Sequence, residues 1–343
     1  YSVDINGRYA IVGAMYDDTD ENGQNGLYQA GSAYFYERIN DSTWIFRDKV
    51  TASNRKRAGQ FGSSVSISSN GNAIIGGHKN ANFSNPTLSG HGALYFFEKN
   101  GNNWNLTTSK DSRGGWDTDL EGDIAVSGQE SRSQIYVLQK DTLTGNWNDL
   151  QAIMPPNTTA SDKPGASVSL NSSWLAIGAA FDDTDENNQN SLLNTGAVYI
   201  YKINAQGTYD FFQKVVAPTR MIGQGFGFQV SMDGETLAIG LPFDELDDMD
   251  TNLIINAGSI FVYKYDQTTN KWLYASKHSG FQRRINDYLG FCLDISNNRF
   301  IAGIPGTRES ANSGAVKNDA GGAYIFNDCS NNMPIQVIVS DTN

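Results

Sequence analysis

The stretch GAVYIYK at Gly196–Lys202 alternates apolar and aromatic side chains after a glycine, and five related stretches occur along the chain. They read GSAYFYE at Gly31–Glu37, GALYFFE at Gly92–Glu98, SQIYVLQ at Ser133–Gln139, GSIFVYK at Gly258–Lys264 and GGAYIFN at Gly321–Asn327. A period of two in segments rich in β-branched and aromatic residues indicates β-strands. The chain therefore repeats one strand-containing element six times.

The central aromatic residue of each stretch gives the repeat length. These residues are Tyr34, Tyr95, Tyr136, Tyr199, Phe261 and Tyr324, separated by 61, 41, 63, 62 and 63 residues. The 34 residues up to Tyr34 and the 19 after Tyr324 together make 53, which is close to one further period. We expect these central aromatics to pack between neighbouring sheets, since a core needs such a repeated stripe.

Three further strands accompany each aromatic strand. An apolar strand ending in glycine precedes it, as in LAIGA at Leu175–Ala179, and an alternating strand such as SVSL at Ser167–Leu170 lies before that. The recurrent glycine is expected where neighbouring sheets crowd together. A fourth strand follows, opened by Trp44, Trp104, Trp147 or Trp272 in four of the repeats.

Four strands in each of six repeats predict an all-β fold, a β-propeller of four-stranded antiparallel blades. Six blades are expected, with seven as the alternative. We assign residues 1–343 to a single propeller domain, with approximate repeats 1–58, 59–113, 114–162, 163–223, 224–286 and 287–343.

The repeats resemble FG-GAP repeats, the units of the integrin alpha-subunit head and of many secreted proteins. The FG pair stands at Phe61-Gly62 and Phe226-Gly227, with YLG at Tyr288–Gly290. The GAP position reads GAM at Gly13–Met15, GAA at Gly178–Ala180, GLP at Gly240–Pro242 and GIP at Gly303–Pro305. The third repeat departs from the pattern, with Trp116-Asp117 in place of FG. This resemblance implies an extracellular or cell-surface binding protein that functions in adhesion.

Composition excludes several classes of protein. The chain has 25 Lys and Arg against 37 Asp and Glu, a net charge of −12, which argues against nucleic-acid binding. No apolar run is long enough for a transmembrane helix, so direct membrane insertion is not expected. The two cysteines, Cys292 and Cys329, could form one disulfide or remain separate thiols, but they cannot complete a four-ligand zinc site. Glycosylation sequons begin at Asn40, Asn82, Asn105, Asn157 and Asn171.

The net charge is concentrated in three loops between the second and third strands. These loops begin at Tyr16, Phe181 and Phe243 and hold 13 acidic residues. Alternating oxygen-bearing side chains are typical of the first half of a calcium loop. The sequence therefore predicts Ca²⁺ with the ligands Asp18, Asp20, Asn22, Asp183, Asp185, Asn187, Asp248, Asp250 and Asn252.

Two alternatives to calcium stay open. The loops could form a solvated acidic rim, or they could pair with basic loops that join one blade to the next. The basic loops carry Arg55-Lys56-Arg57, Arg220 and Arg283-Arg284. Family calcium sites lie between the first and second strands, so no family ligand transfers directly to these loops.

Catalytic motifs are absent from the sequence. We expect His78, His91 and His278 to be surface loop residues, and neither a G-x-S-x-G elbow nor H-E-x-x-H occurs. We predict a non-catalytic, extracellular binding or adhesion module that presents long loops on one face to a protein or glycan. The alternatives are a structural subunit of a surface assembly or filament and, at lower weight, a carbohydrate-active enzyme.

Overall fold

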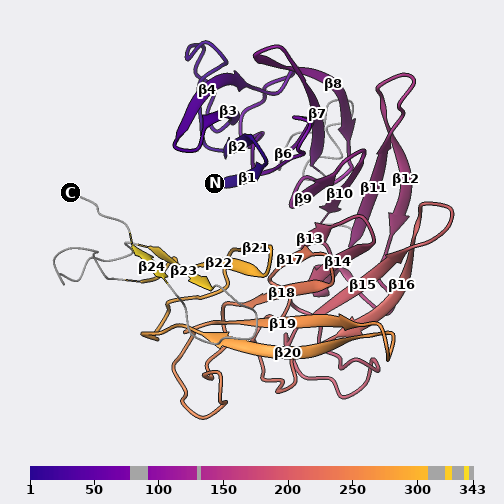
Figure 1. Cartoon of the computed structure of the whole chain (residues 1–343), viewed down its shortest axis with the longest axis vertical. Coiled ribbons are helices and arrows are strands. Elements are labelled where there is room, and N and C mark those ends of the chain that lie inside the picture. The colour runs from indigo at the N-terminus through magenta and orange to yellow at the C-terminus, as the bar shows by residue number, and fades with distance from the viewer. Residues whose placement is uncertain (78–91, 130–132, 308–320, 327–335, 340–343) are drawn as a thin grey trace. The chain divides into compact units, whose positions relative to one another are not determined.

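The computed structural model describes residues 1–77, 92–129, 133–307, 321–326 and 336–339, the last of these for the backbone alone. Their strands form six four-stranded antiparallel sheets, each built from four strands consecutive in the sequence. The fold is an all-β, six-bladed propeller, as the repeat predicts. Figure 1 shows the strands of each blade side by side in chain order. Among the described residues, no helix is long and apolar enough to cross a membrane.

The chain divides into two compact units, described separately below. The N-terminal unit contains Tyr1–Pro156 and Pro164–Leu170, and the C-terminal unit contains Asn157–Lys163 and Asn171–Asn343.

The first three blades lie in the N-terminal unit. Blade 1 contains β1 (Ser2–Asn6), β2 (Tyr9–Ala14), β3 (Ser32–Asn40) and β4 (Thr43–Val50). Blade 2 contains β5 (Ser64–Ile67), β6 (Ala73–Gly77), β7 (Ala93–Asn100) and β8 (Asn103–Asp111). Blade 3 contains β9 (Thr118–Glu121), β10 (Ile124–Gln129), β11 (Gln134–Lys140) and β12 (Trp147–Ile153). The 3-10 turn η3 (Ala160–Asp162) follows in the sequence.

The remaining strands form blades 4 to 6. Blade 4 contains β13 (Ser167–Leu170), β14 (Trp174–Ala179), β15 (Ala197–Ile203) and β16 (Tyr209–Val215). Blade 5 contains β17 (Gln229–Asp233), β18 (Thr236–Leu241), β19 (Ser259–Asp266) and β20 (Lys271–Ser279). Blade 6 contains β21 (Leu293–Ser296), β22 (Arg299–Gly303), β23 (Gly322–Phe326) and β24 (Gln336–Val339).

In blades 1, 2, 3 and 5, the glycine near the end of the second strand lies close to the next blade, as predicted. A Cβ atom at Gly13 would collide with the carbonyl of Gly62, and one at Gly240 would collide with that of Gly290. Blade 2 follows the same rule, because a Cβ at Gly76 would meet Gly115. No side chain larger than hydrogen fits at these positions.

This comparison corrects the sequence assignment of the third repeat. Gly115 takes the position of Gly62, so the FG position there is held by Gly114-Gly115 and not by Trp116-Asp117. The glycine pair was missed because it has no phenylalanine beside it. Trp116 lies one residue further on and is 43% exposed.

Five of the six central aromatics are buried in the core, which confirms the packing prediction for Tyr95, Tyr136, Tyr199, Phe261 and Tyr324. Tyr34 is only partly buried. Three of the tryptophans that open fourth strands, Trp104, Trp147 and Trp272, pack against aromatics of the preceding blade, whereas Trp44 is 38% exposed. Phe35 stacks on Trp104 with 4.3 Å between ring centroids, and Phe96 stacks on Trp147 at 4.6 Å.

Strand register brings two kinds of loop to the same edge of each sheet. In blade 5, Gln229 pairs with Gly240, Leu241 with Ser259, and Ser259 with Ser279. The loop between the second and third strands therefore leaves the sheet beside the connections to neighbouring blades.

Candidate functional site: three acidic loops and their connectors

Three loops with one common structure carry the acidic residues. Loop A (residues 15–31) joins β2 to β3, loop B (180–196) joins β14 to β15, and loop C (242–258) joins β18 to β19. Each lies beside the segment that leads from its blade to the next: connector A (51–63), connector B (216–228) or connector C (280–292). Loop A belongs to the N-terminal unit, and loops B and C belong to the C-terminal unit.

The first acid of each loop forms an ion pair with a lysine of the fourth strand. The pairs are Asp17–Lys49, Asp182–Lys214 and Asp244–Lys277, each with 2.9 Å between Nζ and Oδ2. In blade 4 both partners are buried, with 2% of the Lys214 side chain and 5% of the Asp182 side chain exposed. Because buried charges are retained only when they are paired and hydrogen-bonded, these acids serve the structure of the loops.

Hydroxyl groups complete the surroundings of the same carboxylates. Tyr34 donates a hydrogen bond to Asp17 Oδ2 at 2.7 Å, and Tyr199 donates to Asp182 Oδ2 at 2.6 Å. Blade 5 has a phenylalanine at this position, and Ser259 supplies the donor to Asp244 instead, at 2.5 Å. In blades 1 and 4 the central tyrosine therefore has a second task, as a donor to the first acid of the loop.

These contacts change how two of the carboxyls titrate. Burial opposes ionisation of Asp17, but donors including Lys49 and Ser32 outweigh it and hold the pKa of Asp17 well below its usual value. Burial likewise opposes ionisation of Asp182, and hydrogen bonds from Tyr199 and Lys214 lower the pKa of Asp182 on balance. Both groups are ionised at neutral pH.

The third acid of each loop closes the loop on itself. In loop A, Asp20 Oδ1 accepts backbone N–H groups from Asn22 and Gln24, and Oδ2 accepts from the Asn25 amide at 2.6 Å. Led by the bond from Gln24, these donors lower the pKa of Asp20.

Loops B and C close in the same way. Asp185 receives the backbone N–H groups of Asn187 and Gln189 together with the Asn190 amide. Asp247 receives the N–H of Thr251 at 2.8 Å and the amide of Asn252.

An arginine of each connector binds backbone carbonyls of the neighbouring loop. The contacts are Arg55 to the carbonyls of Asp18 and Asn25, Arg220 to those of Asp183 and Asn190, and Arg283 to those of Glu245 and Asn252, at 2.6–3.0 Å. Main-chain bonds such as Gly223 N to Leu193 O, at 3.0 Å, join loop and connector further. Each arginine therefore latches its connector to its loop.

Most of the predicted calcium ligands already have partners within these loops or on the fourth strands and connectors beside them. Asp18 Oδ1 accepts the N–H of Gln29 at 2.6 Å, and Asp183 Oδ1 accepts that of Asn194 at 2.7 Å. Asp250 pairs with Lys277 at 2.7 Å and accepts from Thr219 at 2.9 Å. Ser279 donates to Asp248 at 3.4 Å.

The asparagine ligands that we predicted are not arranged around a cation. Asn22 and Asn187 give their backbone N–H groups to Asp20 and Asp185, while the Asn252 side chain donates to Asp247. In loop C, Asp247 and not Asp248 takes the position of Asp20 and Asp185.

The donor set in this geometry does not fit calcium, which requires several oxygens aimed at one point. Here the carboxylate oxygens face N–H groups. Within the described residues, no group of three or more His, Cys, Asp or Glu side chains lies close enough to hold a metal ion. Calcium at these loops stays a prediction that the hydrogen bonds do not support.

The acidic residues lie in the loops where the sequence predicts them, but their pairing with Lys49, Lys214 and Lys277 was not predicted. Each lysine lies six residues before the latching arginine, which itself lies six residues before a buried Phe or Leu that precedes glycine. The pattern K-x5-R-x5-[FL]-G occurs after the three blades with acidic loops. At the position of Lys49, blade 2 has Ser109 and blade 3 has Ala152. Comparison between repeats could have revealed the pairing.

The histidine prediction is wrong for His278. This residue lies on β20, is fully buried, and contacts Phe300 and Phe326 with ring centroids 4.9 Å and 5.3 Å away. A single polar residue in an alternating strand gave no sign of which face it occupies. His78, His91 and Cys329 lie outside the described residues, so the proposed disulfide with Cys292 is not tested.

Comparison with known proteins supports the repeat assignment. Residues 44–97 and 147–201 match the FG-GAP repeat. Each matched segment runs from the fourth strand of one blade through the third strand of the next, so it contains the link between two blades. The chain carries FG-GAP repeats in a six-bladed β-propeller.

A solved structure shares the fold over nearly the whole chain. A protein from Lactobacillus plantarum superposes with a TM-score of 0.56 at 10% identity, covering 96% of this chain and 82% of that one. At this identity the likeness concerns the fold alone. No curated protein matches the sequence.

Proposed function

We propose that the chain is a non-catalytic protein-binding module whose contact surface is formed by loops B and C with their connectors, in the C-terminal unit. The observation that carries this proposal is a set of exposed apolar side chains on latched loops. An extracellular setting and an adhesive role belong to the same proposal and rest on the resemblance to integrin-type repeats.

Exposed apolar side chains occur on these two loops and on their connectors. Seven large apolar residues there are between 49% and 78% exposed: Leu193, Ile222, Met249, Leu253, Ile255, Phe281 and Ile285. Scattered single apolar residues are normal on protein surfaces, but a concentration of them marks interaction sites. A protein partner with complementary apolar side chains would bury them.

The latches would reduce the entropic cost of binding. Leu193 and Ile255 each accept a main-chain hydrogen bond from the connector beside them, through Gly223 and Asn286. Arg220 and Arg283 fix the same segments. A loop that is ordered before it meets its partner loses less entropy on binding.

The distribution of polar groups supports a binder over an enzyme. Loop carboxylates that a glycosidase could have used as acid and base instead accept hydrogen bonds from their own loop or pair with lysine. Among the described residues, the histidine is buried in a core cluster.

The test uses a random peptide library displayed on phage and selected against the full chain. Peptides enriched on the protein are expected to bind Leu143→Ser, a control variant whose side chain is 95% exposed on a turn of blade 3. They are expected to lose binding to the double variant Ile222→Ser/Ile285→Ser. Enriched peptides that bind this double variant as well as the unmodified protein would refute the proposed surface.

The structural-subunit alternative uses the same apolar tips and predicts self-association. Sedimentation velocity across a concentration series separates the two. Concentration-dependent assembly that disappears in Ile222→Ser/Ile285→Ser would favour the structural role, and a monomer at every concentration would favour the binding module.

A further inference from the structure

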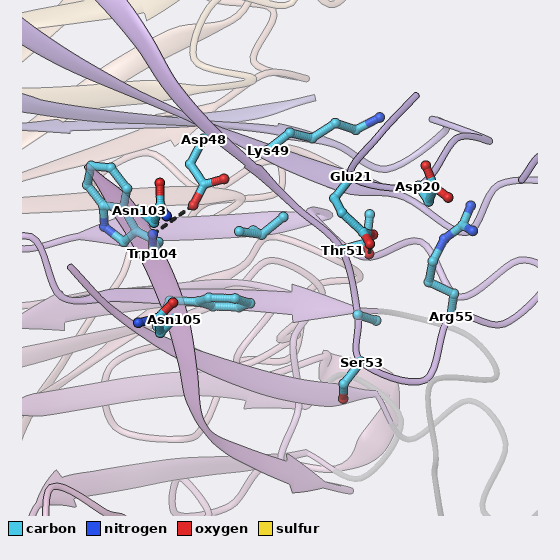
Figure 2. Close-up of a pocket in the computed structure, with 13 residues that line it drawn as sticks. Asp20, Glu21, Asp48, Lys49, Thr51, Ser53, Arg55, Asn103, Trp104 and Asn105 are labelled. Carbon is cyan, nitrogen blue, oxygen red and sulfur yellow. Dashed lines mark hydrogen bonds between the residues drawn. The ribbon is translucent and has the colours of Figure 1, made fainter. Parts of the chain in front are cut away.

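A polar hollow of about 620 Å³ opens between blades 1 and 2 of the N-terminal unit, whereas the proposed protein-binding surface belongs to the C-terminal unit (Figure 2). This volume is typical of small-molecule sites, which range from about 300 to 1,000 Å³. Figure 2 shows Asn103 and Asn105 at one side and Asp20 with Arg55 at the other. The lining also includes the apolar residues Val50, Ala52, Phe97 and Trp104.

The same place between blades 4 and 5 is built differently. There Gln213 bonds both the N–H and the carbonyl of Trp272, at 2.9 Å each, and ties the two fourth strands together. Blade 1 has Asp48 at the position of Gln213, and Asp48 makes one bond, from Trp104 N at 2.7 Å.

Other lining residues also change between the two places. Thr51, Ser53, Asn103 and Asn105 correspond to Val216, Pro218, Lys271 and Leu273. Three of the four matching residues are apolar, so the fold does not require a polar residue at the positions of Thr51, Ser53 and Asn105.

Cationic groups of the lining are already occupied. Lys49 Nζ binds Asp17 and donates to Thr19 at 2.6 Å. Both Nη atoms of Arg55 bind loop carbonyls, and its Nε is buried. An anionic ligand would find no available positive charge, and carboxylates such as Glu21, whose partner is the Thr51 hydroxyl at 3.2 Å and not a cation, would repel it.

Groups that remain accessible both donate and accept hydrogen bonds. The exposed carboxamides of Asn103 and Asn105 have no hydrogen-bond partner in the described part of the chain. Asp48 uses one carboxylate oxygen for Trp104, and Ser53 is exposed. A carboxamide can donate a hydrogen bond to a ligand hydroxyl or accept one from it. A protonated amine only donates, so a site for an amine would need acceptors alone.

We propose that this hollow is a binding groove for a neutral oligosaccharide. Sugar hydroxyls would pair with Asp48, Asn103, Asn105 and Ser53, and the C–H face of a sugar ring would lie over the apolar part of the lining. The proposal is independent of the protein-binding surface, since the two use different blades.

The probes are maltotriose, cellotriose, xylotriose and chitotriose, with spermidine as a cationic comparison, measured by isothermal titration calorimetry. The full chain is produced without N-glycosylation, because Asn105 begins a sequon. At least one sugar is expected to bind, and Asn103→Ala/Asn105→Ala is expected to weaken that binding by about tenfold or more. Lys271→Ala/Leu273→Ala, at the matching positions of blade 5, is expected to leave it unchanged.

A second variant is designed to fill the groove with a longer side chain, whereas the alanine variants remove side chains from it. Asp48→Gln introduces the residue that blade 4 uses, so the chain is expected to fold, and the longer side chain is expected to bridge to Trp104 and abolish sugar binding. The proposal is overturned if no sugar binds, if spermidine alone binds, or if sugar binding survives both Asn103→Ala/Asn105→Ala and Asp48→Gln.

Discussion

Arg220 differs from Arg55 and Arg283 by one hydrogen-bond acceptor. Thr195 Oγ1 accepts from Arg220 Nε at 3.3 Å and from Nη2 at 3.1 Å. The residue at this position is Ala30 beside Arg55 and Ala257 beside Arg283, and the buried Nε atoms of both arginines have no partner among the described residues. Leaving a buried donor unpaired costs free energy.

We therefore predict opposite effects for two reciprocal substitutions. Thr195→Ala is expected to lower the free energy of unfolding by about 1–2 kcal/mol, and Ala257→Thr to raise it by about 0.5–1 kcal/mol. Urea denaturation followed by tryptophan fluorescence measures both. A destabilising Ala257→Thr together with a neutral Thr195→Ala would show that the latch does not depend on this acceptor.

Asp119 is the residue whose titration is expected to make the folding stability depend on pH most clearly. Burial, together with the negative charges of Asp4 and Asp117, raises the pKa of Asp119 to about 7 despite a hydrogen bond from Leu170 N. Burial also raises the pKa of Asp117 to about 6. Ser66 donates to both Asp4 and Asp119, at 2.9 Å and 3.3 Å, so two carboxylates share one hydroxyl.

The protonated form of Asp119 is favoured in the folded state, so its contribution to stability is complete below its ordinary pKa of about 4. That contribution is lost as the pH rises through about 7. Asp119→Asn is expected to flatten the fall in thermal midpoint between about pH 5 and pH 8. An unaltered pH profile in this variant would contradict the assignment.

At the scale of the element, each acidic loop depends on an ion pair that anchors its base. Lys214→Met would leave Asp182 buried without its cation and is expected to cost about 3–5 kcal/mol of unfolding free energy. The double variant Asp182→Asn/Lys214→Met removes both charges and is expected to recover much of this loss. Chemical denaturation of Asp182→Asn, Lys214→Met and the double variant gives the coupling energy between the two residues. Losses that simply add would contradict the pairing.

The strands could be predicted from the sequence because their pattern repeats in every blade. The stretch at Gly196–Lys202 predicts β15, observed at Ala197–Ile203, and the glycine that opens the GAP position predicts the close contact between blades. Gly114-Gly115 was missed because the family motif names phenylalanine, whereas the contact itself requires only the glycine.

The acidic loops were located correctly, but their chemistry was not visible in the sequence. Alternating acids suit calcium, yet the same spacing also lets a carboxylate accept N–H groups two and four residues ahead, as Asp185 does from Asn187 and Gln189. The latching arginines bind backbone carbonyls. Because every residue has a backbone carbonyl, the sequence does not show which residues accept these bonds. The hollow beside Asp48 exists because the side chains between blades 1 and 2 leave space there. The sequence alone does not show how these side chains pack.

At the scale of the whole molecule, much of the net charge of −12 comes from acidic residues that hold the loops together. Less of this charge is therefore available to a partner. Asp17, Asp182 and Asp244 are neutralised by lysine, and the third acid of each loop is surrounded by N–H donors. What the C-terminal unit offers to a partner includes seven exposed apolar side chains on loops B and C and their connectors. We therefore expect partner binding there to depend only weakly on salt, in contrast to binding steered by surface charge.

The central claim is that the acidic loops are held by their own lysines, arginines and amides without a metal ion. The most direct test is the thermal midpoint of the full chain in excess EDTA and then in millimolar calcium, since a ligand bound only by the folded state must raise it. We predict the same midpoint in both conditions. A clear rise in calcium that is lost in Asp20→Ala or Asp185→Ala would contradict the claim and establish the loops as metal sites.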